Sequence, residues 1–382
     1  MGIAELREAA IQFKFRTPLR VTFVALSMLS LFPGVLVAQT GTKPGTTPTP
    51  SVPVATKSAG PATAIAATPT PAASPTPKMP ITNSKPLELK NVRFAIGPYE
   101  ISGMALVAGK LRMVSDNKDD TYLYELKELA PNRLEVIKGK DLRKLVGFQM
   151  YSKHIPQDKN NKLKATRQDF EGIASCGTNM YVIDERTRNV LRFRTDGGFE
   201  RLNIVFNEVK SIYDGGENAG FEGVAVDCDK KILYVAKERQ PRFILKIDLV
   251  KLKILEQTDV IDPTLKNPVP RGTLQKDSVL DFSDLAFDKG YLYALSRNER
   301  DLIKIDTNTW KIVDRRGYGF VENGMYDTGE PYGVAEALVM KPDEILIGID
   351  NNQTNLSKEA TAKYGVSGNG GAVMYFKRPA GF

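Results

Sequence analysis

One short sequence pattern occurs five times between residues 100 and 339, and it restricts the possible folds of this chain more than any other feature. Each copy has a serine or glutamate, then a small or acidic residue, then two apolar residues. The copies occupy residues 100–105, 169–174, 220–225, 281–286 and 334–339. The units that begin with them are called repeats 1 to 5 below.

Each repeat continues with further short apolar segments. Eight to ten residues after the pattern comes a segment that ends in charged or amide residues, such as 181–186 or 234–239. A third segment alternates apolar with polar residues, and repeats 1 to 4 show a weaker fourth one. A period of two in segments rich in Val, Ile, Tyr and Phe is typical of β-strands.

The spacing of the copies predicts an all-β chain folded as a β-propeller. Counted from the Ser or Glu of each copy, at positions 102, 171, 222, 283 and 336, the copies lie 69, 51, 61 and 53 residues apart. A four-stranded blade with insertions has this period, whereas a β-sandwich shows no such repeat. We expect five blades, or six if residues 139–168 contain a degenerate one.

The two ends of this domain are predicted to close the ring. Repeat 5 has only three strand segments, while residues 87–94 form an apolar segment that has no blade of its own. Pairing the two would complete a blade and remove an exposed sheet edge.

The first 85 residues have a different composition. Residues 1–38 combine a basic start, an apolar run and small residues before Gln39, as in a signal peptide, although an uncleaved membrane anchor is an alternative. Residues 39–85 are rich in proline and threonine and poor in large apolar residues, which predicts a disordered linker. The β-propeller domain is expected over 86–382, in a secreted, periplasmic or cell-envelope protein.

Charge and rare residues exclude several classes of function. The formal charge is +8, but residues 91–382 hold 44 basic and 42 acidic side chains, too even a balance for a nucleic-acid-binding surface. The single histidine, His154, lies in a polar insertion, so a Ser-His-Asp triad or a multi-histidine zinc site is not expected. Cys176 and Cys228 occupy equivalent hairpins of adjacent repeats and form either a disulfide or two thiols.

Acidic residues recur at positions that should meet. The first strand of a blade starts on the face of the propeller where the second strand ends, so these residues should surround one mouth of the central channel. Carboxylate oxygens suit a hard cation such as Ca²⁺. The expected metal ligands are Glu100, Asp116, Asp169, Glu171, Asp184, Glu222, Glu336 and Asp350.

Basic residues are interleaved with these acids. Either they form salt bridges that lock the blades together, or they hold an anionic substrate beside the metal. The residues expected to act on such a substrate are Glu171, Glu222, Arg186, Lys237, Arg239 and Arg297.

The motifs at 100–105, 169–174 and 221–225, with Asp-Glu-Arg at 184–186 and Lys-Glu-Arg at 237–239, resemble the phytase-like family of secreted β-propellers and the related SdiA-regulated propellers. The resemblance covers residues 86–382. It implies an exported propeller with esterase-like activity and a pocket at the channel mouth, and by motif position it adds Glu185 and Glu238 to the candidate residues.

Three functions are therefore open. The first is a Ca²⁺-dependent hydrolase of phosphoesters or esters. The second is a non-catalytic propeller that binds a protein, a glycan or a small ligand in the cell envelope. The third is a sugar-lactone hydrolase, whose cation also lies among acid and amide side chains.

Overall fold

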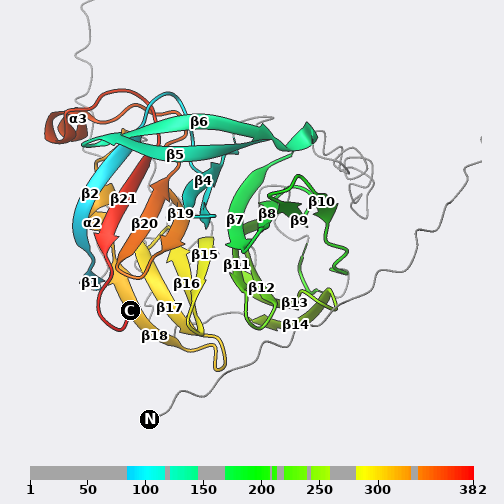
Figure 1. Ribbon diagram of the computed structural model, residues 1–382. Coiled ribbons are helices and arrows are strands. Elements are labelled where there is room, and N and C mark those ends of the chain that lie inside the picture. Colours follow the sequence, from blue (N-terminus) through cyan, green and yellow to red (C-terminus); the bar gives the residue numbers. More distant parts are fainter. Residues whose placement is uncertain are drawn as a thin grey trace, which may run out of the picture. The chain divides into compact units, whose positions relative to one another are not determined.

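The computed structural model describes residues 84–116, 121–144, 168–206, 209–212, 219–238, 242–258, 281–327 and 334–382. The predicted signal peptide, nearly all of the predicted linker, His154 and Arg239 lie outside these residues. The described part consists mostly of antiparallel four-stranded sheets, which is the organisation of a β-propeller (Figure 1). Within it, no helix is long and apolar enough to cross a membrane.

Repeats 1 and 2 each form four consecutive antiparallel strands. Repeat 1 has β3 (Gly103–Val107), β4 (Lys110–Val114), β5 (Tyr122–Ala130) and β6 (Arg133–Asp141), followed by a 3-10 turn, η1 (Leu142–Lys144). Repeat 2 has β7 (Phe170–Cys176), β8 (Asn179–Asp184), β9 (Asn189–Arg194) and β10 (Phe199–Arg201). The weak fourth segments predicted from the sequence are β6 and β10.

Repeats 3 and 4 have the same arrangement. Repeat 3 has β11 (Phe221–Asp227), β12 (Ile232–Lys237), β13 (Phe243–Asp248) and β14 (Lys253–Thr258). Repeat 4 has β15 (Phe282–Asp288), β16 (Tyr291–Ser296), β17 (Asp301–Asp306) and β18 (Ile312–Gly317), and β1 (Lys85–Pro86) is added to β18 in parallel.

Repeat 5 is completed by the N-terminal strand, as predicted. Its own strands are β19 (Ala335–Met340), β20 (Glu344–Ile349) and β21 (Ala372–Lys377), and β2 (Glu88–Ala95) pairs with β21 antiparallel. Two short helices also belong to this part of the chain: α2 (Gly319–Glu322) precedes β19, and α3 (Lys358–Tyr364) lies between β20 and β21.

The other edge of β2 is also paired, which the sequence did not predict. Phe94 and Ala95 pair in parallel with Arg133 and Leu134 of β6, so the sheets of repeats 5 and 1 form one eight-stranded sheet (Figure 1). The ion pair between Arg93 and Glu128, at 2.7 Å, lies beside this junction.

The core consists of five apolar clusters, each between two successive repeats, and one of them joins repeat 5 to repeat 1. Alternate residues of one strand enter different clusters, because side chains of a strand point to opposite faces. In β8, for example, Tyr181 and Ile183 pack against repeat 3, whereas Met180 and Val182 pack against repeat 1. The repeats therefore follow one another around a closed ring.

The first strands of neighbouring repeats approach so closely that they require glycine. A Cβ atom on Gly103 would lie 2.1 Å from the carbonyl oxygen of Glu171, and one on Gly172 would lie 2.3 Å from that of Glu222. Repeat 4 has Asp284 at this position, and its carboxylate accepts hydrogen bonds from the backbone of Leu285 and Leu338, both at 2.7 Å. Crowding at the centre of the ring thus explains the small residue in the motif.

We expect Gly172→Ala to lower the free energy of unfolding by at least about 2 kcal/mol, because the added methyl meets backbone that no side-chain rotation can move. The measurement is denaturant unfolding. Gly177→Ala in the next hairpin is the control, since its Cβ would meet open space and only its φ of +61° is unfavourable. Equal losses in the two variants would contradict the role assigned to Gly172.

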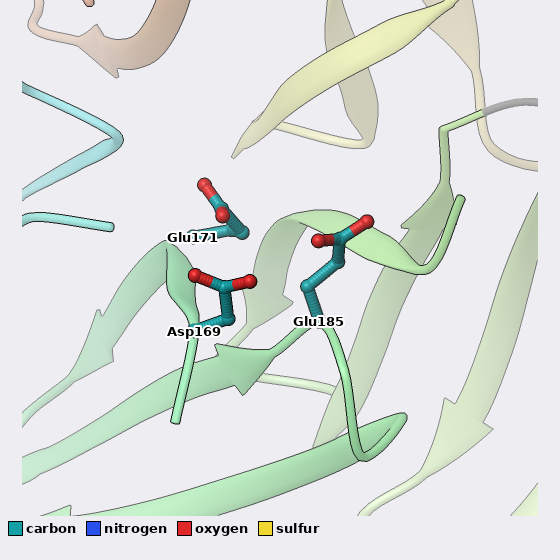
Figure 2. A group of neighbouring side chains, drawn as sticks. All are labelled: Asp169, Glu171 and Glu185. Atoms are coloured by element: carbon teal, nitrogen blue, oxygen red, sulfur yellow. The ribbon is translucent and has the colours of Figure 1, made fainter. Parts of the chain in front are cut away.

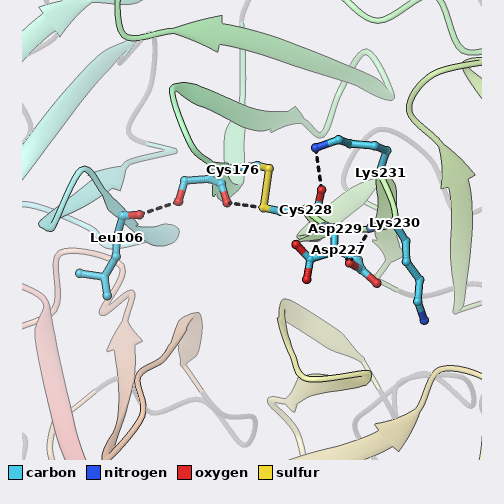
Figure 3. Close-up of a disulfide and its surroundings, with 8 residues drawn as sticks. Leu106, Cys176, Asp227, Cys228, Asp229, Lys230 and Lys231 are labelled. Atoms are coloured by element: carbon cyan, nitrogen blue, oxygen red, sulfur yellow. Dashed lines mark hydrogen bonds between the residues drawn. A yellow bond between two sulfur atoms is a disulfide. The ribbon is translucent and has the colours of Figure 1, made fainter. Parts of the chain in front are cut away.

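Cys176 and Cys228 form a disulfide with their Cα atoms 5.6 Å apart (Figure 3). It joins the β7–β8 hairpin of repeat 2 to the β11–β12 hairpin of repeat 3. The neighbouring Ser175 hydroxyl donates to the carbonyl oxygen of Leu106 in repeat 1, at 2.5 Å. Three consecutive repeats are thus linked through these hairpins.

Replacing both cysteines with serine should lower the free energy of unfolding by about 2–4 kcal/mol, because the bridge closes a long loop and restricts the unfolded chain. Thermal and denaturant unfolding with and without reductant would measure this. Reductant should destabilise the wild type and leave the double variant unchanged. A wild type that is insensitive to reductant would show that the bridge does not stabilise the fold.

Candidate functional site

The strand registers identify equivalent residues in the five repeats. Ile173 pairs with Val182 in repeat 2, and the matching pair in repeat 4 is Leu285 with Ala294. Aligning the five repeats on such pairs gives two sets of equivalent residues. One set lies at the start of each first strand, and the other lies just after each second strand. The first-strand positions are Ser102, Glu171, Glu222, Ser283 and Glu336, and the second-strand positions are Asp116, Glu185, Glu238, Arg297 and Asp350.

Carboxylates from these positions converge. Three sets of three have oxygen atoms that all lie within 4.8 Å of one another: Asp169, Glu171 and Glu185; Glu171, Glu222 and Glu336; Glu185, Glu222 and Glu238. Figure 2 shows the first set, which lies at one end of the β7–β8 pair, where β7 starts and β8 ends. These six residues are called the acid centre below. Glu171 and Glu336, which meet there, are 165 residues apart in the chain.

Glu171 and Glu222 are the most isolated members. Each residue is 7% exposed, and within the described residues neither carboxylate accepts a hydrogen bond or forms an ion pair. Burial raises the pKa of both, and repulsion raises it further, chiefly from Glu222 acting on Glu171 and from Glu238 acting on Glu222.

Arg297 supplies positive charge to one side of the acid centre. Its guanidinium forms ion pairs with Glu238, Asp281 and Glu336, the one to Asp281 at 3.0 Å. Burial opposes the charge on Arg297, but its three carboxylate partners outweigh that effect and hold its pKa above the usual range. Of the two roles expected for the basic residues, Arg297 has the first, because it forms salt bridges between repeats. Its expected binding to an anionic substrate stays a prediction.

The other expected basic residues differ in exposure. The Nε atom of Arg186 lies 2.5 Å from Asp169, and this side chain is 27% exposed. Lys237 is fully buried, with its ammonium 6.0 Å from the centre of the Phe243 ring. Arg188, which the sequence analysis did not single out, is buried and donates to the carbonyl oxygen of Glu185 at 3.0 Å.

Three of the remaining expected ligands, Glu100, Asp116 and Asp350, interact electrostatically with Glu336 of the acid centre. Glu100, Asp116 and Asp350 repel one another and Glu336, but they belong to none of the three close sets of the described residues. Burial raises the pKa of Glu100 to about 7 and that of Asp116 to about 6. Asp184 is fully buried, and its carboxylate accepts from the backbone of Thr187.

Sequence reasoning missed some contributors. Gln353 donates a hydrogen bond to Glu100, but nothing in the motif pattern identifies it. Asp284 could have been found from the sequence, since it stands where repeats 1 to 3 have glycine.

A surface hollow of about 510 Å³, lined in part by Arg192 and Arg194 of β9, includes no residue of the acid centre.

The SdiA-regulated family model matches residues 159–335, which include five of the six residues of the acid centre. Over these residues the chain is similar to the SdiA-regulated family. The match thus confirms, over this part of the chain, the resemblance to SdiA-regulated propellers drawn from the sequence motifs.

Solved structures with similar folds have low sequence identity. A glutaminyl cyclase from Myxococcus xanthus is 12% identical with a TM-score of 0.44, over 77% of this chain and 100% of that one. A luciferin-regenerating enzyme is 13% identical with a TM-score of 0.39, over 75% of this chain and 94% of that one. The PQQ-bound aldose sugar dehydrogenase from Streptomyces coelicolor is 11% identical with a TM-score of 0.39, over 76% and 99%. These similarities assign no activity to this chain.

The buried carboxylates predict that stability falls as pH rises. Glu185 titrates near 4.5 when unfolded, whereas burial raises its pKa in the folded protein to about 8. Between these values the folded state binds more protons than the unfolded state, so the free energy of unfolding decreases with increasing pH. Without added metal, the unfolding midpoint should be higher at pH 5.5 than at pH 8.

Glu185→Gln should reduce this pH dependence, because glutamine does not titrate and roughly 1.4 kcal/mol accompanies each unit of pKa shift. Glu256→Gln, on exposed β14, is the control and should keep the wild-type slope. A stability that rises between pH 5.5 and 8 in metal-free wild type would contradict the assigned protonation.

Proposed function

We propose that this protein is an exported β-propeller that binds Ca²⁺ at the acid centre and hydrolyses anionic phosphoesters or esters there. The observation that carries the proposal is the convergence of Glu171, Glu222 and Glu336, from three repeats, at a point where two of these carboxylates have no partner among the described residues.

The charges of the acid centre support a bound cation. Arg297 pairs with Glu238 and Glu336, and Arg186 pairs with Asp169. Glu171 and Glu222 are left without an ion pair, and burying such groups in charged form is unfavourable. They must therefore take up protons or a cation, and a divalent cation would neutralise both.

The donor set fits a hard cation. All six residues offer carboxylate oxygen, the ligand type that Ca²⁺ prefers, and none offers the nitrogen or sulfur that zinc favours. Glu171, Glu222, Glu185 and Asp169 would hold the ion. When bound, it would supply the Lewis acidity that activates water and polarises an ester or phosphoryl oxygen.

Arg186 is the residue best suited to receive the anionic part of a substrate. It is the most exposed of the described basic residues beside the acid centre, and its contact with Asp169 fixes its position. Lys237, which is fully buried and directly precedes Glu238 in the chain, would add positive charge and limit repulsion between the acids and an incoming anion. Arg239 is proposed to act with Arg186 from the equivalent position of the next repeat.

We further infer that the propeller has five blades, one for each repeat. The first strands contact one another in the closed order β3, β7, β11, β15, β19 and back to β3, and each begins a separate set of four strands when β2 is counted with repeat 5.

Export is part of the proposal. The Cys176–Cys228 disulfide supports it, because such bridges persist mainly in oxidising compartments outside the cytosol. The apolar run in residues 1–38 gives the same indication.

A non-catalytic binding propeller is the second candidate. It is favoured by the deep burial of the acid centre, where Glu171, Glu222 and Glu336 are each exposed by less than a tenth. In that case the cation would hold the repeats together, and ligands would bind elsewhere on the same face.

The test is the release of phosphate from phytate and from an aryl phosphate, with Ca²⁺ and with EDTA. We expect EDTA to abolish hydrolysis and Glu222→Gln to lower kcat/KM by at least about 10²-fold, because a ligand of the charged centre is lost. Glu256→Gln is the matched control and should keep full activity.

Unfolding followed with and without Ca²⁺ separates the two candidates. Chelator-sensitive stability without hydrolysis would favour the binding propeller. Stability and activity that are both insensitive to chelator would overturn the cation site itself.

A further inference from the structure

Repeat 4 differs from repeats 2, 3 and 5 at both positions that build the acid centre. At the second-strand position four repeats have a carboxylate, and only repeat 4 has a basic residue, Arg297. At the first-strand position repeat 4 has Ser283, whose hydroxyl donates to the carbonyl oxygen of Ala335 at 2.8 Å. Repeat 4 therefore contributes positive charge where its neighbours contribute negative charge.

The contacts of Arg297 span three repeats. Its three carboxylate partners are Glu238 after β12, Asp281 before β15 and Glu336 on β19. Asp281 is itself held in place, because its other oxygen accepts from the backbone of Asn298 at 3.1 Å. The guanidinium is 9% exposed and uses all three of its nitrogen atoms, so it is fixed rather than free to reach toward a ligand.

On the side of the acid centre away from Arg297, fewer positive charges pair with the carboxylates. Glu171 and Glu222 are more than nine-tenths buried and have no partner in the described residues, and their oxygens face those of Asp169, Glu185 and Glu336. The acid centre is thus divided into a side whose carboxylates pair with Arg297 and a side where Glu171 and Glu222 have no ion pair among the described residues.

We propose that Arg297 is an internal counter-ion that occupies the place of a cation in repeat 4 and so limits the acid centre to one divalent cation, bound on the side of Asp169, Glu171, Glu185 and Glu222. This proposal rests on the cation binding proposed above and adds its stoichiometry and position. A guanidinium keeps its charge at every physiological pH and repels a second cation at short range.

Removal of Arg297 would expose a second set of ligands. Glu238, Asp281 and Glu336, three carboxylates from three repeats, would then face one another without the guanidinium that now pairs with all of them. This is the same kind of donor set as the one on the opposite side, and it would bind a second divalent cation.

The experiment is equilibrium dialysis of the purified full chain against Ca²⁺, followed by elemental analysis of bound calcium per protein. We expect one equivalent for the wild type and two for Arg297→Gln. Arg297→Lys, which keeps the charge, should bind one. Arg300→Gln is the matched control, because Arg300 lies three residues away, has a side chain that is only 11% exposed and pairs with Glu322 outside the acid centre, and it should also bind one.

A charge-balanced variant guards against misfolding. Arg297→Gln combined with Asp281→Asn removes one charge of each sign and still leaves Glu238 and Glu336 facing the vacated position, so it should bind two equivalents. Circular dichroism would verify that each variant is folded.

The outcomes distinguish the two proposals. One equivalent in the wild type and in both glutamine variants would overturn the role of Arg297 while leaving the cation site intact. No calcium in the wild type would overturn the proposed cation binding and, with it, the stoichiometry assigned here.

Discussion

The structure depends on the close approach of the first strands of successive repeats. Gly103 and Gly172 lie so near the next strand that a Cβ atom would be within 2.1–2.3 Å of its carbonyl oxygen. The residue before each of these glycines is thereby brought near its counterparts in the neighbouring repeats. The same tight packing that excludes larger side chains from one position brings Glu171, Glu222 and Glu336 together at the position before it, so the fold and the acid centre have a common origin.

Bringing these carboxylates together in a buried place causes electrostatic repulsion. Positive side chains reduce that repulsion for some of the carboxylates and not for others. Arg297 forms ion pairs with three carboxylates in one part of the ring, whereas Glu171 and Glu222 have no such partner among the described residues. A ring built only for stability would be expected to pair every buried charge, since an unpaired one is expensive. Unequal compensation is more consistent with a centre that takes up a cation.

The ring is held closed by a strand that is paired on both edges. β2 completes repeat 5 through β21 and also joins repeat 1 through β6. The apolar cluster between repeats 5 and 1 lies beneath this junction. Closure therefore keeps Glu336 of repeat 5 in register with Glu171 and Glu222, and the acid centre depends on a strand that supplies none of its ligands.

Sequence alone determined the strands, their grouping into repeats and the pairing of residues 87–94 with repeat 5, because period-two patterns and a recurring motif are local properties of the chain. It also indicated that Glu171, Glu222 and Glu336 would share one site. Only the tertiary structure decided that Arg297 would pair with three carboxylates, that Asp284 would bond to the backbone of repeat 5, and that β2 would pair with β6. These contacts depend on distances of a few ångströms between residues far apart in the chain, and no local pattern specifies such distances.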